Sequence, residues 1–124
     1  MKPRRRAVLL AALLGPLARP AGAEISAVEA ARIERLIRFV ASQAQVKFIR
    51  NGSAYSAQDA AQFLRAKYAD RGGNVTTAAQ FIDQIASRSS TSGQAYLMQF
   101  PDGRIVPSAQ GLAEELARID RGKP

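Results

Sequence analysis

The first 23 residues differ in character from the rest of the chain, and they limit how much of it is available to fold. A strongly basic start, Met1 to Arg6, is followed by an apolar run from Ala7 to Ala18 and then by the small-residue triplet Ala21-Gly22-Ala23. These are the three parts of a secretory signal peptide, and the apolar run is well short of the roughly 20 residues of a membrane-spanning helix. We therefore expect cleavage after Ala23 and a periplasmic or secreted protein that does not span the membrane.

The predicted signal peptide also carries much of the positive charge. The chain has 18 Lys and Arg against 10 Asp and Glu, and five of the basic residues lie within residues 1–23. The remaining 13 basic residues exceed the acidic ones by only three. Such a small excess does not favour nucleic acid as a partner.

The chain contains neither cysteine nor histidine. No disulfide is therefore available to stabilise the fold, and the residues that most often bind zinc, copper or haem are missing. We expect no metal and no cofactor. Residues 24–124 suffice for one domain with a modest core.

Four segments of this part have the pattern of helices. The first extends from Ser26 to about Gln45, and Ser26 and Glu29 are spaced as a capping box, in which the glutamate reaches back to the backbone of the serine. Its apolar residues recur at helical spacing: Ile33, Leu36, Ile37, Val40 and Ala44.

The other three helices have their own start signals. Ser56 begins the second helix, which ends at residues 71–74, where two glycines and an asparagine turn the chain. The third extends from Thr77 to about Ser87, with Thr77 as its cap. Ser108 is expected to cap the last helix.

Short strands are expected between these helices. Val46–Arg50 alternates and ends in Asn51-Gly52, the preferred pair for a type I′ turn, so residues 53–55 can return beside it. Residues 95–100 and 104–106 flank a Pro-Asp-Gly turn and form a hairpin. We predict an α+β domain over residues 24–124, with about four helices packed on a small antiparallel sheet that contains this C-terminal-half hairpin.

Four segments together resemble a known family. They are Phe48-Ile49-Arg50-Asn51-Gly52, Ala60-Ala61-Gln62-Phe63-Leu64-Arg65-Ala66-Lys67, Thr77-Ala78-Ala79-Gln80-Phe81-Ile82-Asp83 and Ser89-Ser90-Thr91-Ser92-Gly93-Gln94-Ala95-Tyr96. In this order and spacing they resemble the YfeK-like family of small exported bacterial proteins with a domain of unknown function. The resemblance implies export and a shared fold, and it implies no activity. The family pattern has a histidine where this chain has Phe63.

One group of polar residues is suited to bind an anion, because guanidinium groups offer forked donors and a Ser/Gly loop can present backbone N–H groups. Its members are Arg50, Asn51, Tyr55, Arg65, Lys67, Ser89, Ser90 and Ser92. The alternative is structural: Arg50 bonds loop carbonyls, Asn51-Gly52 serves only the turn, and the serines cap neighbouring elements.

An enzymatic alternative uses Ser89 or Ser90 as nucleophile and Lys67 as base. Such a lysine needs burial to lower its pKa by several units, and no nucleophile-elbow or S-x-x-K motif accompanies it. We therefore favour a non-enzymatic binding or interaction module for an anionic envelope component or an envelope protein. A small serine–lysine hydrolase and a structural accessory protein are the alternatives, and the oligomeric state is left open.

The predicted cleavage can be checked on the native product. Mass spectrometry of the protein purified from its own host is expected to find Glu24 as the first residue, because the Ala-x-Ala triplet ends at Ala23. A product that retains Met1 and stays in the cytosol would contradict the predicted export.

Overall fold

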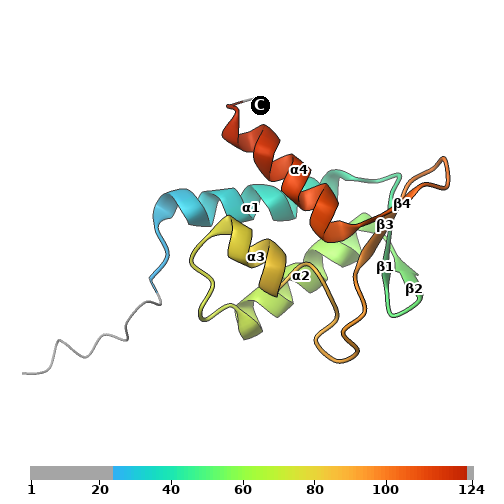
Figure 1. Cartoon of the computed structure of the whole chain (residues 1–124), viewed down its shortest axis with the longest axis horizontal. Helices are drawn as coiled ribbons and strands as arrows, with labels where there is room; N and C mark the ends of the chain where they lie inside the picture. The colour runs from blue at the N-terminus through green and yellow to red at the C-terminus, as the bar shows by residue number, and fades with distance from the viewer. Residues whose placement is uncertain (1–23, 123–124) are drawn as a thin grey trace, which may run out of the picture.

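The computed structural model describes residues 24–122, so the predicted signal peptide lies outside the described part (Figure 1). Along the chain, the elements are α1 (Ala27–Ser42), β1 (Lys47–Arg50), β2 (Ser53–Tyr55), α2 (Ala57–Arg71), α3 (Ala78–Gln84), β3 (Leu97–Gln99), β4 (Ile105–Pro107) and α4 (Ser108–Asp120). The predicted α+β class, with four helices and an antiparallel sheet, is confirmed for these residues.

Helix α1 is the central element of the core. Four of its residues, Ile33, Leu36, Ile37 and Val40, are at most 1% exposed. The helix packs on α2, α3 and α4, and in Figure 1 it crosses the middle of the view with α4 above it. Because a fully buried aliphatic side chain contributes about 1.5–3 kcal/mol, the apolar stripe of this helix is a major source of stability.

The sheet joins the two predicted hairpins side by side. Its order is β2-β1-β3-β4, and all neighbouring strands are antiparallel. Phe48 on β1 lies opposite Tyr55 on β2 and Met98 on β3. Helix α2 contacts β1, and α4 contacts β3 and β4, so these two helices connect the sheet to the helical core.

The turn between β1 and β2 has the predicted type I′ character. Asn51 has a φ of 51° and Gly52 a φ of 80°. A type I′ turn requires positive φ at both central residues, which explains why asparagine and glycine occupy these positions.

Two helices end earlier than their apolar patterns indicate. Helix α1 ends at Ser42 instead of about Gln45, because Val46 N already donates to the carbonyl of Gln43 in a turn. Helix α3 ends at Gln84 instead of about Ser87. The carbonyl of Ser87 accepts from Tyr96 N at 3.0 Å, which draws this segment toward the chain that leads into β3.

Three of the four predicted caps are confirmed. Ser26, Ser56 and Thr77 each accept a hydrogen bond from a backbone N–H in the first turn of their helix. The prediction for Ser108 is wrong: Pro107 occupies the N-cap position of α4, and Ser108 is the first helical residue. The side chain of Ser108 caps nothing, and its Oγ is buried without a hydrogen-bond partner in the described residues.

The capping box predicts that Glu29 reaches back to the backbone of Ser26, and the structure does not show this contact. The carboxylate of Glu29 accepts instead from Ala78 N, at the start of α3, at 2.8 Å, and it pairs with Arg32 at 2.6 Å. Arg32 also binds Asp120, the last residue of α4, at 2.7 Å. A carboxylate is favourable at a helix N-terminus, and here it connects α1, α3 and α4.

Replacing Glu29 by alanine is therefore expected to lower the free energy of unfolding by about 1–2 kcal/mol, because Ala78 N and Arg32 both lose a partner. Urea unfolding measures the change. The control is Glu114→Ala, which removes an exposed carboxylate from α4 and is expected to change stability by at most about 0.5 kcal/mol. Equal effects of the two substitutions would contradict the role assigned to Glu29.

Candidate functional site

A hollow of about 340 Å³ lies between the end of β1, helix α2 and the loop of residues 88–94. We call it the basic pocket and define it by six of its lining residues: Arg50, Lys67, Arg71, Ser89, Ser90 and Thr91. The aromatic rings of Phe63 and Tyr96 also line it. Four of the eight residues predicted for an anion site, Arg50, Lys67, Ser89 and Ser90, therefore meet in one place.

Lys67 is the buried cation of this pocket. It is 7% exposed, and its Nζ donates to the carbonyl of Arg88 at 2.8 Å and to the hydroxyl of Tyr96 at 3.0 Å. Burial lowers the pKa of Lys67, and the positive charges of Arg71, Arg88 and Arg50 lower it further. Within residues 24–122, no carboxylate forms an ion pair with Lys67 to offset these charges.

Arg50 is held by aromatic rings. Its guanidinium carbon lies 4.5 Å from the ring centroid of Phe63 and 5.2 Å from that of Tyr55, and one nitrogen donates to the Tyr55 hydroxyl at 3.4 Å. Within the described residues Arg50 donates to no loop carbonyl, so this part of the structural alternative is not formed. Because a guanidinium has five N–H donors, most of those on Arg50 have no partner in the described protein and are available to a ligand.

The serine-rich loop is held in shape by its own side chains. Ser89 Oγ accepts from Thr91 N at 3.2 Å, from Ser92 N at 3.3 Å and from Asn51 Nδ2 at 3.3 Å. The hydroxyl of Ser92 donates to Asn51 Oδ1. Asn51 and Ser92 thus hold the loop from outside the pocket, whereas Ser89, Ser90 and Thr91 line it. Of these three, Ser89 is buried and the other two are exposed.

The arrangement that a serine–lysine hydrolase needs is not formed in the described residues. A nucleophile and its base should lie within hydrogen-bond reach. Lys67 Nζ binds a carbonyl and a phenol, and Ser89 Oγ bonds with Asn51 and Thr91. The hydroxyl of Ser89 therefore stabilises the loop, and the hydrogen bonds give it no base.

Arg65 is one of the four predicted residues that do not line the basic pocket. It forms a two-pronged ion pair with Glu34 of α1, at 2.7 and 2.6 Å. This pair lowers the pKa of Glu34 and raises that of Arg65. Tyr55 lines no part of the basic pocket, but it orients Arg50.

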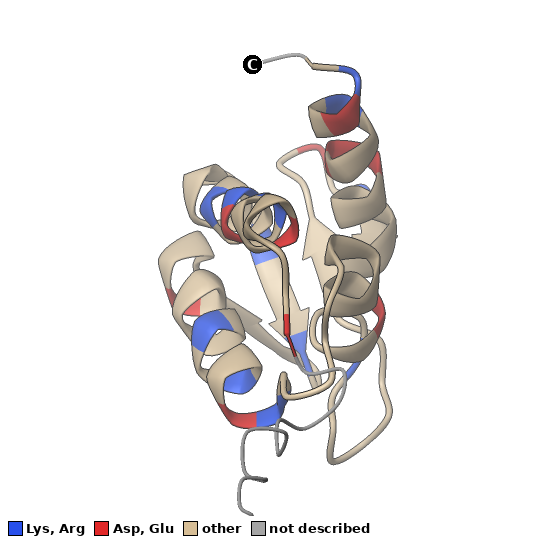
Figure 2. Ribbon diagram, turned by 90° about the vertical axis from the view of Figure 1, so that its left-hand side faces the viewer, with Lys and Arg blue, Asp and Glu red and all other residues tan. Residues whose placement is uncertain are grey.

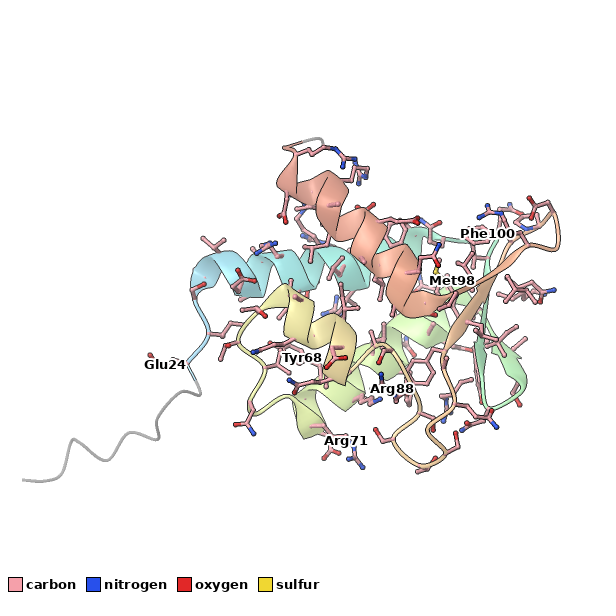
Figure 3. The ribbon with its side chains drawn as sticks, viewed as in Figure 1. Glu24, Tyr68, Arg71, Arg88, Met98 and Phe100 are labelled. Atoms are coloured by element: carbon pink, nitrogen blue, oxygen red, sulfur yellow. The ribbon has the colours of Figure 1, made fainter. Side chains whose placement is uncertain are left out.

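Arg71 and Arg88 belong to the site and were missed by sequence reasoning. Figure 3 labels Arg71 at the end of α2 and Arg88 in the segment after α3. Arg71 follows Lys67 by four residues, and i,i+4 spacing on a helix places two side chains on one face. This spacing was the available signal for Arg71, whereas no local signal places Arg88 next to Lys67.

The positive charge of the pocket is local. The carboxylate residue Asp70 also lines the pocket, and its Oδ2 lies 3.7 Å from Arg71 Nε. Elsewhere both signs of charge are distributed over the ribbon, as Figure 2 shows from one side.

No helix within residues 24–122 has the length and apolar character needed to cross a membrane. In the same part of the chain, no cluster of acidic side chains is arranged to bind a metal ion.

Comparisons with known proteins place the chain in a family. The model of the family described as "Family of unknown function (DUF5329)" matches residues 27–120, and the chain belongs to this family. The "Uncharacterized protein YfeK" of Salmonella typhimurium strain LT2 is 39% identical to it over 77 residues. These residues are 62% of this chain and 64% of the relative, so the match spans less than two thirds of that protein. No solved structure matches. The resemblance to the YfeK-like family is confirmed.

The lowered pKa of Lys67 has a measurable effect on stability. An unfolded lysine binds its proton more tightly than Lys67 does, so folding becomes more favourable as the pH rises toward 10.5, the ordinary pKa of lysine. We expect the free energy of unfolding of the wild type, relative to Lys67→Met, to increase between pH 7 and pH 10. Urea unfolding at several pH values measures it.

The comparison stops at pH 10 because of Tyr96. Burial raises the pKa of Tyr96, so its ionisation in the unfolded chain lowers stability above pH 10. The control variant is Lys47→Met, which removes an exposed ammonium from β1. It measures how the loss of one exposed lysine charge alone changes the free energy of unfolding over the same pH range. A difference between wild type and Lys67→Met that is constant from pH 7 to pH 10 would contradict the lowered pKa.

Proposed function

We propose that this protein is an exported binding module, and that its basic pocket binds an anionic group, a carboxylate or a phosphate, on its ligand. The observation that carries the proposal is the charge around Lys67. Three arginines, Arg50, Arg71 and Arg88, act on this buried ammonium, and Asp70 is the carboxylate at the pocket. Like charges gathered in this way repel one another, and a bound anion relieves the repulsion.

The geometry suits such a ligand. Arg50 offers forked donors whose orientation is fixed by two aromatic rings, and the buried Lys67 adds a compact charge to the same pocket. Charge-assisted hydrogen bonds to an anion are about twice as strong as neutral ones, and they strengthen where water is partly excluded. The pocket therefore supports binding without requiring a nucleophile, in keeping with the role of Ser89 in the loop.

The proposal that the protein is exported rests on its sequence. The basic start, the short apolar run and the Ala-x-Ala triplet of residues 1–23 support export. An exported protein meets anionic components of the envelope and envelope proteins with exposed carboxylates, and both offer the proposed chemistry. Nucleic acid is not the proposed partner, because residues 24–124 carry only three more basic than acidic residues.

Two arginines of the site allow a test with a charge-matched control. The double variant Arg71→Gln, Arg88→Gln is expected to bind inorganic phosphate and acetate about tenfold more weakly than the wild type, since each substitution removes a charge next to Lys67. Titration followed by ¹H–¹⁵N NMR measures the affinity, and in the wild type the amides of residues 89–93 are expected to shift.

The control is Arg35→Gln, Arg38→Gln, which removes the same charge from exposed positions on α1. This variant is expected to bind both anions as the wild type does. Equal weakening in the two double variants would show that net charge, and not the basic pocket, attracts the anions, and the proposal would then fail.

A further inference from the structure

A second hollow, of about 220 Å³, adjoins the basic pocket. We call it the apolar pocket and define it by Val40, Phe48, Leu64, Ala86, Ser108 and Leu112, which come from α1, β1, α2, the segment after α3, and α4. Arg50, Phe63 and Tyr96 line both pockets. The two hollows therefore share a wall, and the guanidinium of Arg50 belongs to that wall.

The apolar pocket extends from the surface to the core. Arg50 and Tyr55 on its rim are half-buried, whereas Val40, Ala86 and Leu112 are 1% exposed. Protein interiors are otherwise close-packed, so a space of this size leaves many side-chain atoms without neighbours. An apolar cavity of roughly 150 Å³ is sufficient to bind benzene, and this one is larger.

Ser108 gives the pocket a polar feature. The residue is 5% exposed, and its Oγ has no hydrogen-bond partner in the described residues. Its backbone is fixed, because Ser108 N donates to the carbonyl of Tyr96 at 2.8 Å. An unpaired buried hydroxyl costs about 1–3 kcal/mol, and a polar ligand atom in the pocket would remove that cost.

We infer that the ligand is a small amphiphilic anion whose apolar body fills the apolar pocket while its charged group binds in the basic pocket. The inference rests on the proposed function for the charged end. A polar atom at the far end of the body pairs with Ser108 Oγ. The exposed carboxylate of Asp59 on the rim of the apolar pocket disfavours the reversed orientation, so the charge stays beside Arg50.

Three probes separate the two parts of the ligand. Acetate carries only the charged group, toluene only the apolar body, and 3-phenylpropionate both. We expect 3-phenylpropionate to bind the wild type about tenfold more tightly than acetate or better, because it buries a phenyl ring. We also expect toluene alone to shift the methyl resonances of Val40, Leu64 and Leu112 in ¹H–¹³C NMR spectra.

A substitution that fills the apolar pocket tests whether the phenyl ring binds there. Ala60, half-buried on α2, lines the apolar pocket but not the basic one, so Ala60→Leu is expected to abolish the advantage of 3-phenylpropionate and to leave acetate binding unchanged. The control is Ala113→Leu, at an exposed position of α4, which is expected to preserve both affinities. The toluene measurement requires no variant and holds even if Ala60→Leu does not fold.

The outcomes distinguish this inference from the proposed function. If acetate and phosphate bind in the basic pocket but 3-phenylpropionate binds no better and toluene shifts no pocket methyl, the inference is overturned and the proposed function stands. If toluene binds but no anion shifts residues 89–93, the proposed function fails and the inference, which needs an anionic ligand, fails with it, although the apolar pocket still binds an apolar molecule. An advantage of 3-phenylpropionate that survives Ala60→Leu also overturns the inference.

The hydroxyl of Ser108 is tested by one further probe. 3-(4-Hydroxyphenyl)propionate adds a hydroxyl at the far end of the ring, and we expect it to bind the wild type about fivefold more tightly than 3-phenylpropionate. In Ser108→Ala this gain is expected to vanish while the affinity for 3-phenylpropionate is retained. Absence of the gain in the wild type, or its persistence in the variant, overturns the pairing with Ser108.

Discussion

Burial of one face of α1 is the interaction on which the rest of the structure depends. The chain has no cysteine, so no disulfide supplements the core. Helix α1, with its four buried residues, contacts three other helices, and two of those helices, α2 and α4, contact the sheet. The last of the four, Val40, also lines the apolar pocket. The helix that stabilises the fold thus contributes to the wall of the hollow proposed to receive a ligand.

Local features of the fold were predictable because their causes lie within a few residues. The type I′ turn follows from Asn51-Gly52, and the start of α1 follows from the hydroxyl of Ser26. Features set by distant partners were not. The strand order, in which β1 lies beside β3, is set by segments about 50 residues apart. Glu29 binds Ala78 N, which no pattern around Glu29 reveals. A capping box is a local preference, and here a tertiary partner replaced it.

The candidate site was predicted in part for the same reason. Lys67 follows Leu64 by three residues, so helical spacing places it near the core face of α2, and it is buried in the structure. Arg65 lies only two positions away and therefore points to another side of the helix, where Glu34 binds it. The apolar pocket was not predictable, because a sequence identifies residues such as Leu64 and Leu112 as core but does not show the space that their packing leaves.

The two outer strands of the sheet have a consequence for how copies of this protein meet. Strands β2 and β4 contain three residues each, and β4 ends at Pro107, which has no N–H to donate. Exposed strand edges are templates for the addition of a strand from another molecule, and short edges interrupted by proline are poor ones. The sheet therefore offers little opportunity for edge-to-edge aggregation, even when thermal motion loosens a fold that has no covalent cross-links.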